Sequence, residues 1–373
     1  MIQTRWKNFS KFGHCIELGH DLIMKDLPHA LHEFNLSKSF AAEPMPWLAA
    51  LVCASAFDLA IHDAYGVVNH VPVYQAYGKE YLSTDLSIFL QPAKGSCVGF
   101  GSKYPSDFLN LKLPRKIAVW HLVGGLDPLD IEDLTGDEPE DDYPVHLREW
   151  INRDGLKCLK VKLRGNDSDW DYARLVRIGV LAQELGVKHL TTDFNCTVTD
   201  PSYVNEILDR LKREEKETFR RILYVEQPFP YDLEKNPIDV HSVAERKPLF
   251  MDESAHDWKH VQRGKELGWN GVALKTCKTQ TGALLSLCWA KAHGMDLMVQ
   301  DLTNPMLAQI PHVLLGAHAG TIMGVESNSM QFYPEASLRE ARIHPGVFRR
   351  KGGFLDLSTI RGNGFGYRLS EMK

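Results

Sequence analysis

The sequence predicts a (β/α)8 barrel of the TIM type, an α/β fold, with a smaller α+β capping domain. From residue 116 onward, eight short apolar runs alternate with longer segments whose apolar residues recur at helical intervals. This alternation predicts parallel strands with right-handed crossovers, and eight such strands close into a barrel. The rival fold, an open doubly wound sheet, would carry a glycine-rich phosphate turn after its first strand. Gly124-Gly125 does not continue as such a turn.

The N-terminal residues 1–115 do not follow this repeat, and we expect them to form the capping domain. Apolar spacing predicts a helix over residues 48–65 that ends near Gly66, followed by a helical piece over residues 73–77. Short strands are expected within residues 14–24 and over residues 87–90.

The barrel is expected to span residues 116–328. Its predicted strands are 117–123, 159–163, 189–193, 222–226, 249–252, 271–275, 297–301 and 321–326. Its predicted helices are 169–185, 201–214, 238–246, 257–267, 281–293 and 305–318. Residues 329–373 are irregular and rich in glycine, and we expect them to return to the capping domain.

Composition excludes several classes of protein. A net charge of −5 and a pI near 6.3 give no basic footprint for nucleic acid. The apolar run at residues 47–57 is too short to span a bilayer, and the N-terminus has no signal-peptide core. The seven cysteines are odd in number and show no paired spacing, which favours a reducing compartment. We therefore expect a cytoplasmic protein without a membrane or nucleic-acid partner.

Three successive predicted strands end in a carboxylate: Asp193, Glu226 and Asp252. They lie roughly 30 residues apart, about the length of one strand-plus-helix unit, so they fall at equivalent strand ends. A single aspartate at a strand end is usually a helix N-cap. Three in register predict a site for one hard divalent cation, which takes oxygen ligands.

Lysines occupy two other strands of the predicted barrel. Lys160 and Lys162 share one face of the second strand because side chains alternate. Burying unpaired charge is costly, so two inward lysines indicate chemistry, although paired and snorkelling lysines are the structural alternative. Lys275 ends the sixth strand, across the barrel from the second. A cation and ammonium groups together stabilise the enediolate formed when a proton is removed α to a carboxylate.

The order Lys-x-Lys, Asp-x-Asn, Val-Glu-Gln-Pro, Asp-Glu-Ser and a final lysine resembles the enolase superfamily, in its muconate-lactonising branch. A lysine or histidine base with Mg²⁺ is established for that superfamily and is implied here by resemblance alone. The resemblance implies metal ligands Asp193, Glu226 and Asp252 and acid/base residues Lys162 and Lys275. It also implies substrate contacts for Lys160 and Glu326, with Lys160 lowering the pKa of Lys162, and supporting roles for Asn195 and Glu253.

Some positions depart from relatives of this branch. The mandelate racemase pattern has an aspartate and a histidine where this chain has Lys275 and Asp301. Dipeptide epimerases carry Asp-x-Asp near the eighth strand, whereas this chain reads Glu326-Ser327-Asn328. The mandelate racemase mechanism is therefore disfavoured, and so is a dipeptide substrate. Asp301 either binds a substrate hydroxyl or amine, or caps the following helix.

The resemblance implies an isomerase or lyase that abstracts the proton α to a carboxylate with one Mg²⁺. Racemisation or epimerisation, cycloisomerisation and dehydration share this first step. The expected partner is a small-molecule carboxylate, and a homo-oligomer is expected from the family. The alternatives are a Schiff-base aldolase with Lys275 as nucleophile, and a non-catalytic barrel protein.

Overall fold

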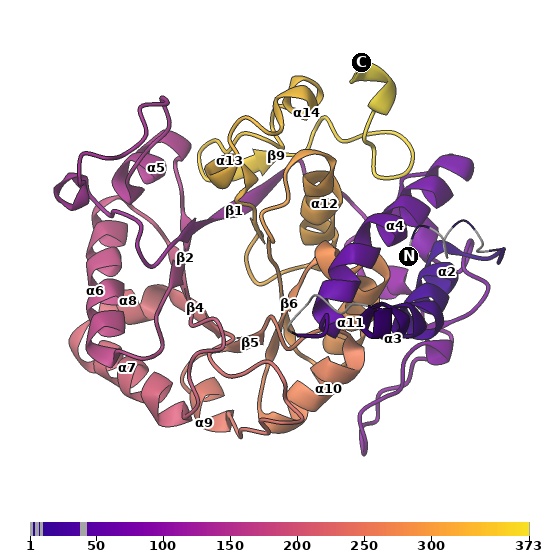
Figure 1. Cartoon of the computed structure of the whole chain (residues 1–373), viewed down its shortest axis with the longest axis horizontal. Helices are drawn as coiled ribbons and strands as arrows, with labels where there is room; N and C mark the ends of the chain where they lie inside the picture. Colours follow the sequence, from indigo (N-terminus) through magenta and orange to yellow (C-terminus); the bar gives the residue numbers. More distant parts are fainter. Residues whose placement is uncertain (1–2, 4–6, 8–9, 38–42, 373) are drawn as a thin grey trace.

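The computed structural model describes residues 3, 7, 10–37 and 43–372. It confirms the predicted barrel (Figure 1), whose strands run in the order β7-β6-β5-β4-β3-β2-β1-β8 and pair in parallel. The ring is nearly closed, and a backbone hydrogen bond of 2.8 Å from Ile322 N to Leu297 O joins β7 to the segment before β8. The strands are β1 Lys116–Val123, β2 Cys158–Lys162, β3 His189–Asp193, β4 Ile222–Glu226, β5 Leu249–Met251, β6 Gly271–Leu274, β7 Asp296–Val299 and β8 Val325–Glu326.

The helices around the barrel begin at aspartate caps in several places. The side chains of Asp167, Asp200 and Asp257 accept backbone N–H groups at the starts of α6, α7 and α10. Two helices, α5 and α8, were not predicted, and α9 is shorter than predicted. The helices are α5 Leu147–Asp154, α6 Ser168–Glu184, α7 Pro201–Glu214, α8 Lys216–Arg221, α9 His241–Ala244, α10 Trp258–Leu267, α11 Gln280–Ala292 and α12 Gln309–Ala319.

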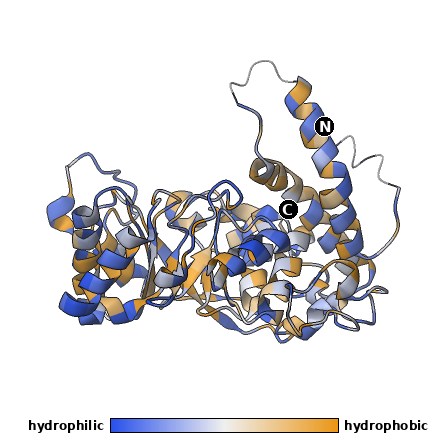
Figure 2. Ribbon diagram, turned by 90° about the horizontal axis from the view of Figure 1, so that it is seen from below, coloured by the Kyte–Doolittle hydropathy of each residue, from blue (hydrophilic) through white to orange (hydrophobic). Residues whose placement is uncertain are grey.

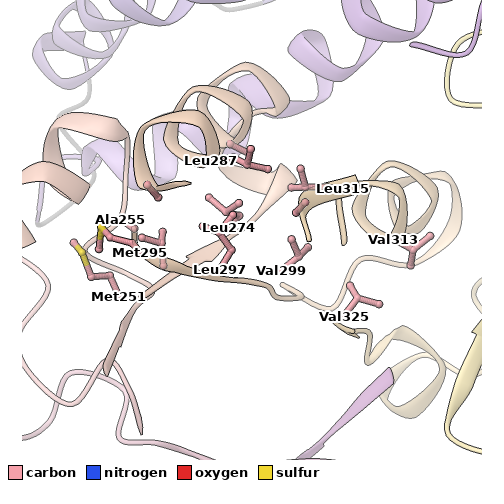
Figure 3. Close-up of a cluster of buried hydrophobic side chains, with 14 of the residues drawn as sticks. Met251, Ala255, Leu274, Leu287, Met295, Leu297, Val299, Val313, Leu315 and Val325 are labelled. Atoms are coloured by element: carbon pink, nitrogen blue, oxygen red, sulfur yellow. The ribbon is translucent and has the colours of Figure 1, made fainter. Parts of the chain in front are cut away.

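The main core lies between the strands and these helices. Figure 3 shows Leu274, Leu297 and Val299 from β6 and β7 beside Leu287 of α11 and Leu315 of α12. A second buried cluster lies on the opposite face of the strands from the main core. It contains Trp120, Cys158, Tyr224, Phe250 and Met298. Figure 2 shows hydrophobic residues on the central strands, and surrounding helices that carry both hydrophilic and hydrophobic residues. The two clusters pack the inside and the outside of the strand ring.

The N-terminal region is helical in its described residues. It contains α2 Cys15–Asp21, a π-helix Leu22–Asp26, α3 Leu27–Ser37 and α4 Trp47–Val68. The strand predicted within residues 14–24 is wrong because His14 and Glu17 form a capping box that starts α2. The strand predicted over residues 87–90 is also wrong, since Asp85 caps a 3-10 turn, Leu86–Ile88. The second helical piece is a 3-10 helix, Val73–Tyr77.

Helix α4 joins this region to the barrel and lies beside α11 (Figure 1). By length and composition it is the one helix among the described residues that could cross a membrane. Its Asp58 and His62 side chains are nevertheless fully buried against the start of α11, as in a core helix. The helix continues through Gly66 to Val68. A Cβ at Gly66 would lie 2.7 Å from Gly364 Cα, so glycine serves close packing there and does not end the helix.

The C-terminal segment packs on both parts of the molecule. It contains α13 Ser329–Phe332, α14 Leu338–Ile343 and β9 Phe354–Asp356, and β9 pairs antiparallel with β1. Further on, Gly364 N donates to Val71 O at 2.9 Å and Phe365 N donates to Asp63 Oδ1 at 2.8 Å. These hydrogen bonds tie the end of the described chain to the N-terminal helical region.

Candidate active site

The interior face of β2 carries the two predicted lysines. Cys158, Lys160 and Lys162 alternate with residues that face the helices, so all three line the inside of the barrel. Cys158 belongs to the buried interior cluster, which lies beneath the lysines. Lys160 is buried, and Lys162 keeps 23% of its side chain exposed. Lys162 therefore lies nearer the open end of the barrel.

Lys160 is surrounded by carboxylates from three strands. Its Nζ lies 2.5 Å from Glu226 Oε1 of β4, 3.1 Å from Asp193 Oδ2 of β3 and 3.2 Å from Glu326 Oε2 of β8. Burial by itself lowers the pKa of Lys160, but Glu226 and Glu326 outweigh it and raise the pKa well above its usual value. Lys160 therefore carries a positive charge that holds these acids together.

The two predicted acid/base lysines lie at the ends of β2 and β6, two strands that stand opposite each other in the ring. Lys162 Nζ is 2.5 Å from Asp193 Oδ2, and Lys275 Nζ, immediately after β6, is 2.7 Å from Asp252 Oδ2. Lys275 is buried. Burial lowers the pKa of Lys275, but Asp252 raises it above its ordinary value. Both amines thus point into the barrel toward the strand-end acids.

Asp193, Glu226 and Asp252 are fully or almost fully buried at the ends of β3, β4 and β5. Burial, followed by repulsion from Asp193, raises the pKa of Glu226 well above its usual value. In Asp193, burial is outweighed by Lys160 and Lys162, which lower its pKa to about 2. In Asp252, burial is outweighed by Lys275 and Lys278, which hold the pKa far below its usual range. Lysines therefore outweigh burial at Asp193 and Asp252, whereas burial and repulsion dominate at Glu226.

The candidate ligands for a hard cation are the three strand-end carboxylates. Within the described ranges, no three His, Cys, Asp or Glu side chains are already gathered as a metal cage, and the acids turn toward lysine amines. The three carboxylates are buried oxygen donors at successive strand ends, and after burial the negative charge of Asp193 is the next cause that raises the pKa of Glu226. A divalent cation would neutralise that charge, so the residues fit one.

Two polar side chains that were not predicted complete the site. Lys278 is buried, and its Nζ donates to Asp252 O, to Asp252 Oδ1 at 3.2 Å and to Ala255 O at 3.4 Å. Gln300, after β7, donates through Nε2 to Glu226 and to Tyr224 OH. The Lys-x-x-Lys spacing after β6 was the available signal for Lys278, because residues three apart in a helical turn lie on one side.

The loops behind the acids are joined by hydrogen bonds. Gln227 Oε1 accepts from Asp252 N at 2.7 Å and Ser254 Oγ at 2.7 Å, which links the ends of β4 and β5. Asn195 N donates to Asp193 Oδ1 at 2.9 Å, and Asn195 Nδ2 lies 3.4 Å from Glu253 Oε1. The structure therefore places Asn195 and Glu253 next to Asp193 and Asp252. The supporting roles of Asn195 and Glu253 stay predictions.

Asp301 and Glu326 lie at the ends of β7 and β8. Asp301 accepts Asn304 N at 2.8 Å and Asn328 N at 2.7 Å, so it joins the two loops. Asp301 does not cap the following helix, because the 3-10 turn Met306–Ala308 that leads into α12 has Pro305 as its N-cap and no side-chain cap hydrogen bond. Glu326 Oε1 accepts from Asn328 Nδ2 at 2.7 Å, while Oε2 faces Lys160. Substrate binding by Lys160, Asp301 and Glu326 stays a prediction.

The molecule is thus an α/β barrel with acids at three successive strand ends and lysines at the ends of two opposite strands. The family model described as "Enolase C-terminal domain-like" matches residues 142–373. The chain therefore belongs to the enolase superfamily, in the mandelate racemase/muconate lactonizing enzyme family. None of the curated proteins matches the chain in sequence.

Solved structures show the same fold at low identity. A mandelate racemase/muconate lactonizing protein from Herpetosiphon aurantiacus is 21% identical, with a TM-score of 0.60 over 94% of this chain and 78% of that one. A dipeptide epimerase from Methylococcus capsulatus, complexed with a Mg ion, is 20% identical, with a TM-score of 0.56 over 92% and 79%. A muconate lactonizing enzyme from Klebsiella pneumoniae is 13% identical, with a TM-score of 0.57 over 94% and 82%.

Proposed function

We propose that this protein abstracts the proton α to the carboxylate of a small organic acid and stabilises the resulting enediolate, as an isomerase or lyase. The observation that carries the proposal is the placement of Lys162 and Lys275 on opposite strands, each within 2.7 Å of a buried strand-end acid. Two amines on opposite sides of one centre can serve both faces of a planar intermediate.

Each charged residue has a distinct task in this proposal. Lys160, held among three carboxylates, binds the substrate carboxylate and places the α-carbon between the two other lysines. Lys162 or Lys275 removes the α-proton. For racemisation or epimerisation the opposite lysine returns a proton to the other face. For cycloisomerisation or dehydration it stabilises negative charge while bonds rearrange elsewhere in the substrate.

Asp193, Glu226 and Asp252 are the residues that would hold one Mg²⁺. The cation would supply charge stabilisation for the enediolate oxygens. Support comes from the donor chemistry of the three buried acids and from the Mg ion in the similar dipeptide epimerase structure. We keep a homo-oligomeric state and a cytoplasmic location as expectations from sequence.

The test is uptake of deuterium from D₂O at the α-carbon, screened over acid sugars, N-acyl amino acids and muconates with Mg²⁺ present. We expect exchange in the wild type, a loss with EDTA that added Mg²⁺ restores, and a fall of about a thousandfold or more in Lys162→Ala and Lys275→Ala. Lys188→Ala, a change at an exposed lysine, is the matched control. Exchange that survives the double substitution Lys162→Ala/Lys275→Ala refutes the assignment of the bases.

The aldolase alternative makes a different prediction. It requires borohydride to trap a carbonyl substrate on Lys275 without added metal. It also leaves the three buried strand-end acids without a chemical role, which is why we rank it second. The non-catalytic alternative predicts that a calorimetric titration with Mg²⁺ gives no heat of binding.

A further inference from the structure

A second cavity lies outside the strand ring, away from the candidate active site. It has a volume of about 720 Å³ and lies between the end of α5 and the C-terminal segment. Figure 1 shows α5 and α13 near β1. We call it the basic cleft, and define it by Arg153 and Asp154 of α5 together with the lining residues within 329–351. Its volume is in the range of small-molecule sites.

The lining of the basic cleft is strongly positive. Arg153, Arg349, Arg350 and Lys351 line it, and Asp154 is the one carboxylate among the lining residues. Arg349 and Lys351 are exposed there. The whole chain carries a net charge of −5, so this concentration of cations is not a reflection of overall composition. A concave surface of one sign attracts ligands of the opposite sign.

Arg350, at the base of the cleft, is an incompletely compensated buried charge. Its side chain is fully buried, and its Nε donates to Asp154 Oδ2 at 2.7 Å. Asp154 also accepts from Arg153 Nε at 3.0 Å, so one carboxylate serves two guanidinium groups. The Nη2 atom of Arg350 is buried and has no hydrogen-bond partner among the described residues. A buried donor left in this way is costly unless a ligand or water satisfies it.

The two other neighbours of Arg350 carry no negative charge. One is the ring of Trp150, whose centroid lies 5.1 Å from the guanidinium carbon, and the other is His121. Arg350 Nη1 lies 3.0 Å from His121 Nδ1 of β1, which must be the unprotonated nitrogen to accept this hydrogen bond. Burial, and then Arg350 itself, hold the pKa of His121 well below its usual value. The neutral imidazole orients the guanidinium without neutralising it.

The lining of the cleft also contains large apolar side chains. Tyr333 and Leu338 are 55% and 56% exposed, and Phe348 is buried. A ligand that joined an anionic group to an apolar body could contact both the cationic and the apolar side chains.

We propose that the basic cleft is a second binding site, for a small organic anion with a carboxylate or phosphate group and an apolar portion. The anionic group lies among Arg349, Arg350 and Lys351, and the apolar portion lies against Tyr333 and Leu338. Ser329 and Met330 also line the cleft and follow Glu326 by three and four residues. The site therefore lies beside the segment that leaves the barrel interior, and it does not depend on the proposed reaction.

Calorimetric titration of the full chain with benzoate, phenyl phosphate and neutral benzyl alcohol tests the proposal. We expect at least one of the two anions to bind with a Kd of about 1 mM or tighter, and benzyl alcohol to bind at least tenfold more weakly. The tighter of the two anions identifies the anionic group. Arg349→Gln/Lys351→Gln changes two exposed residues, so the variant should fold, and it should weaken anion binding about tenfold or more.

The matched control is Lys79→Gln/Lys94→Gln, which removes the same charge from two exposed lysines of the N-terminal region. It should leave binding unchanged. A third variant, Lys162→Ala, should also leave this binding unchanged, because it changes only the barrel interior. Equal weakening by both glutamine pairs, loss of binding in Lys162→Ala, or no binding of either anion to the wild type would each overturn the proposal.

Discussion

At the scale of single residues, Lys278 shows how one buried ammonium group holds the candidate metal ligand Asp252 in place. It contacts both the backbone carbonyl and the carboxylate of Asp252, while Lys275 contacts the other carboxylate oxygen. The acid is thus fixed between two lysines from one turn of chain. Without Lys278, the carbonyl oxygens of Asp252 and Ala255 would lose a buried donor.

We therefore predict that Lys278→Met lowers the free energy of unfolding by about 2–3 kcal/mol, because buried acceptors lose a charged partner. Urea denaturation measures this change. Lys188→Met, at an exposed lysine, is the control and should shift stability by less than about 0.5 kcal/mol. A shift as small as the control's in Lys278→Met would show that Lys278 does not hold Asp252.

The same residues show what sequence can and cannot predict about a site. Asp193, Glu226 and Asp252 were found because each ends a strand of a regular repeat, so local pattern was enough. Lys278 and Gln300 were missed because their roles depend on which strand end lies across the barrel. The hydrogen bonds that Asp301 accepts from Asn304 N and Asn328 N were also missed, since they depend on the path of the loop after β8.

At the scale of elements, the barrel was predictable because each strand is a short apolar run followed by an amphipathic helix. The errors lie where that pattern is absent. Helix α5, which follows a long acidic loop, was not identified, and neither was β9, which forms by pairing with β1. The two wrong strands fell where side-chain caps start helical turns, at His14 and Asp85. Local capping outweighed the apolar pattern at both places.

The junction of α5 with the C-terminal segment depends on a glycine. Gly155 ends α5 with φ +64°, and a Cβ there would lie 2.7 Å from Gly352 Cα. We predict that Gly155→Ala destabilises the protein by about 2 kcal/mol or more, because left-handed strain adds to a clash with backbone. Urea denaturation measures the change.

Gly136→Ala is the matched control for this junction. Gly136 also has a positive φ, +92°, but nothing lies within 4 Å of a Cβ built there. Its substitution should bring backbone strain alone, about 1 kcal/mol. Equal losses in the two variants would mean that close packing of Gly155 on Gly352 adds nothing to stability.

At the scale of the whole molecule, a buried polar junction joins the N-terminal helices to the barrel. Asp58 of α4 accepts Thr281 N at 2.9 Å and Thr281 Oγ1 at 2.7 Å, at the first turn of α11. His62 lies 2.8 Å from the same hydroxyl and 2.7 Å from Tyr77 OH. Helix α11 follows the segment that carries Lys275 and Lys278, so this junction fixes the N-terminal region beside one wall of the candidate site.

Burial raises the pKa of Asp58 from 3.8 to about 6, against the hydrogen bonds from Thr281. The folded state therefore binds a proton more tightly than the unfolded state does. The resulting stability is fully present below pH 3.8 and is lost as the pH rises through about 6. Burial lowers the pKa of His62 well below 6.5, and this acts in the opposite direction, since stability is then lost as the pH falls below 6.5.

Comparison with Asp58→Asn separates the two effects, because the variant keeps His62 and an acceptor for Thr281 but does not titrate at residue 58. We predict that the stability of the wild type relative to Asp58→Asn falls by about 1 kcal/mol between pH 5 and pH 7. Urea denaturation at several pH values measures this difference. A stability difference between the two proteins that stays constant or grows with pH would contradict this prediction. It would show that Asp58 is ionised throughout this range and that Thr281 and its surroundings fully compensate the buried charge.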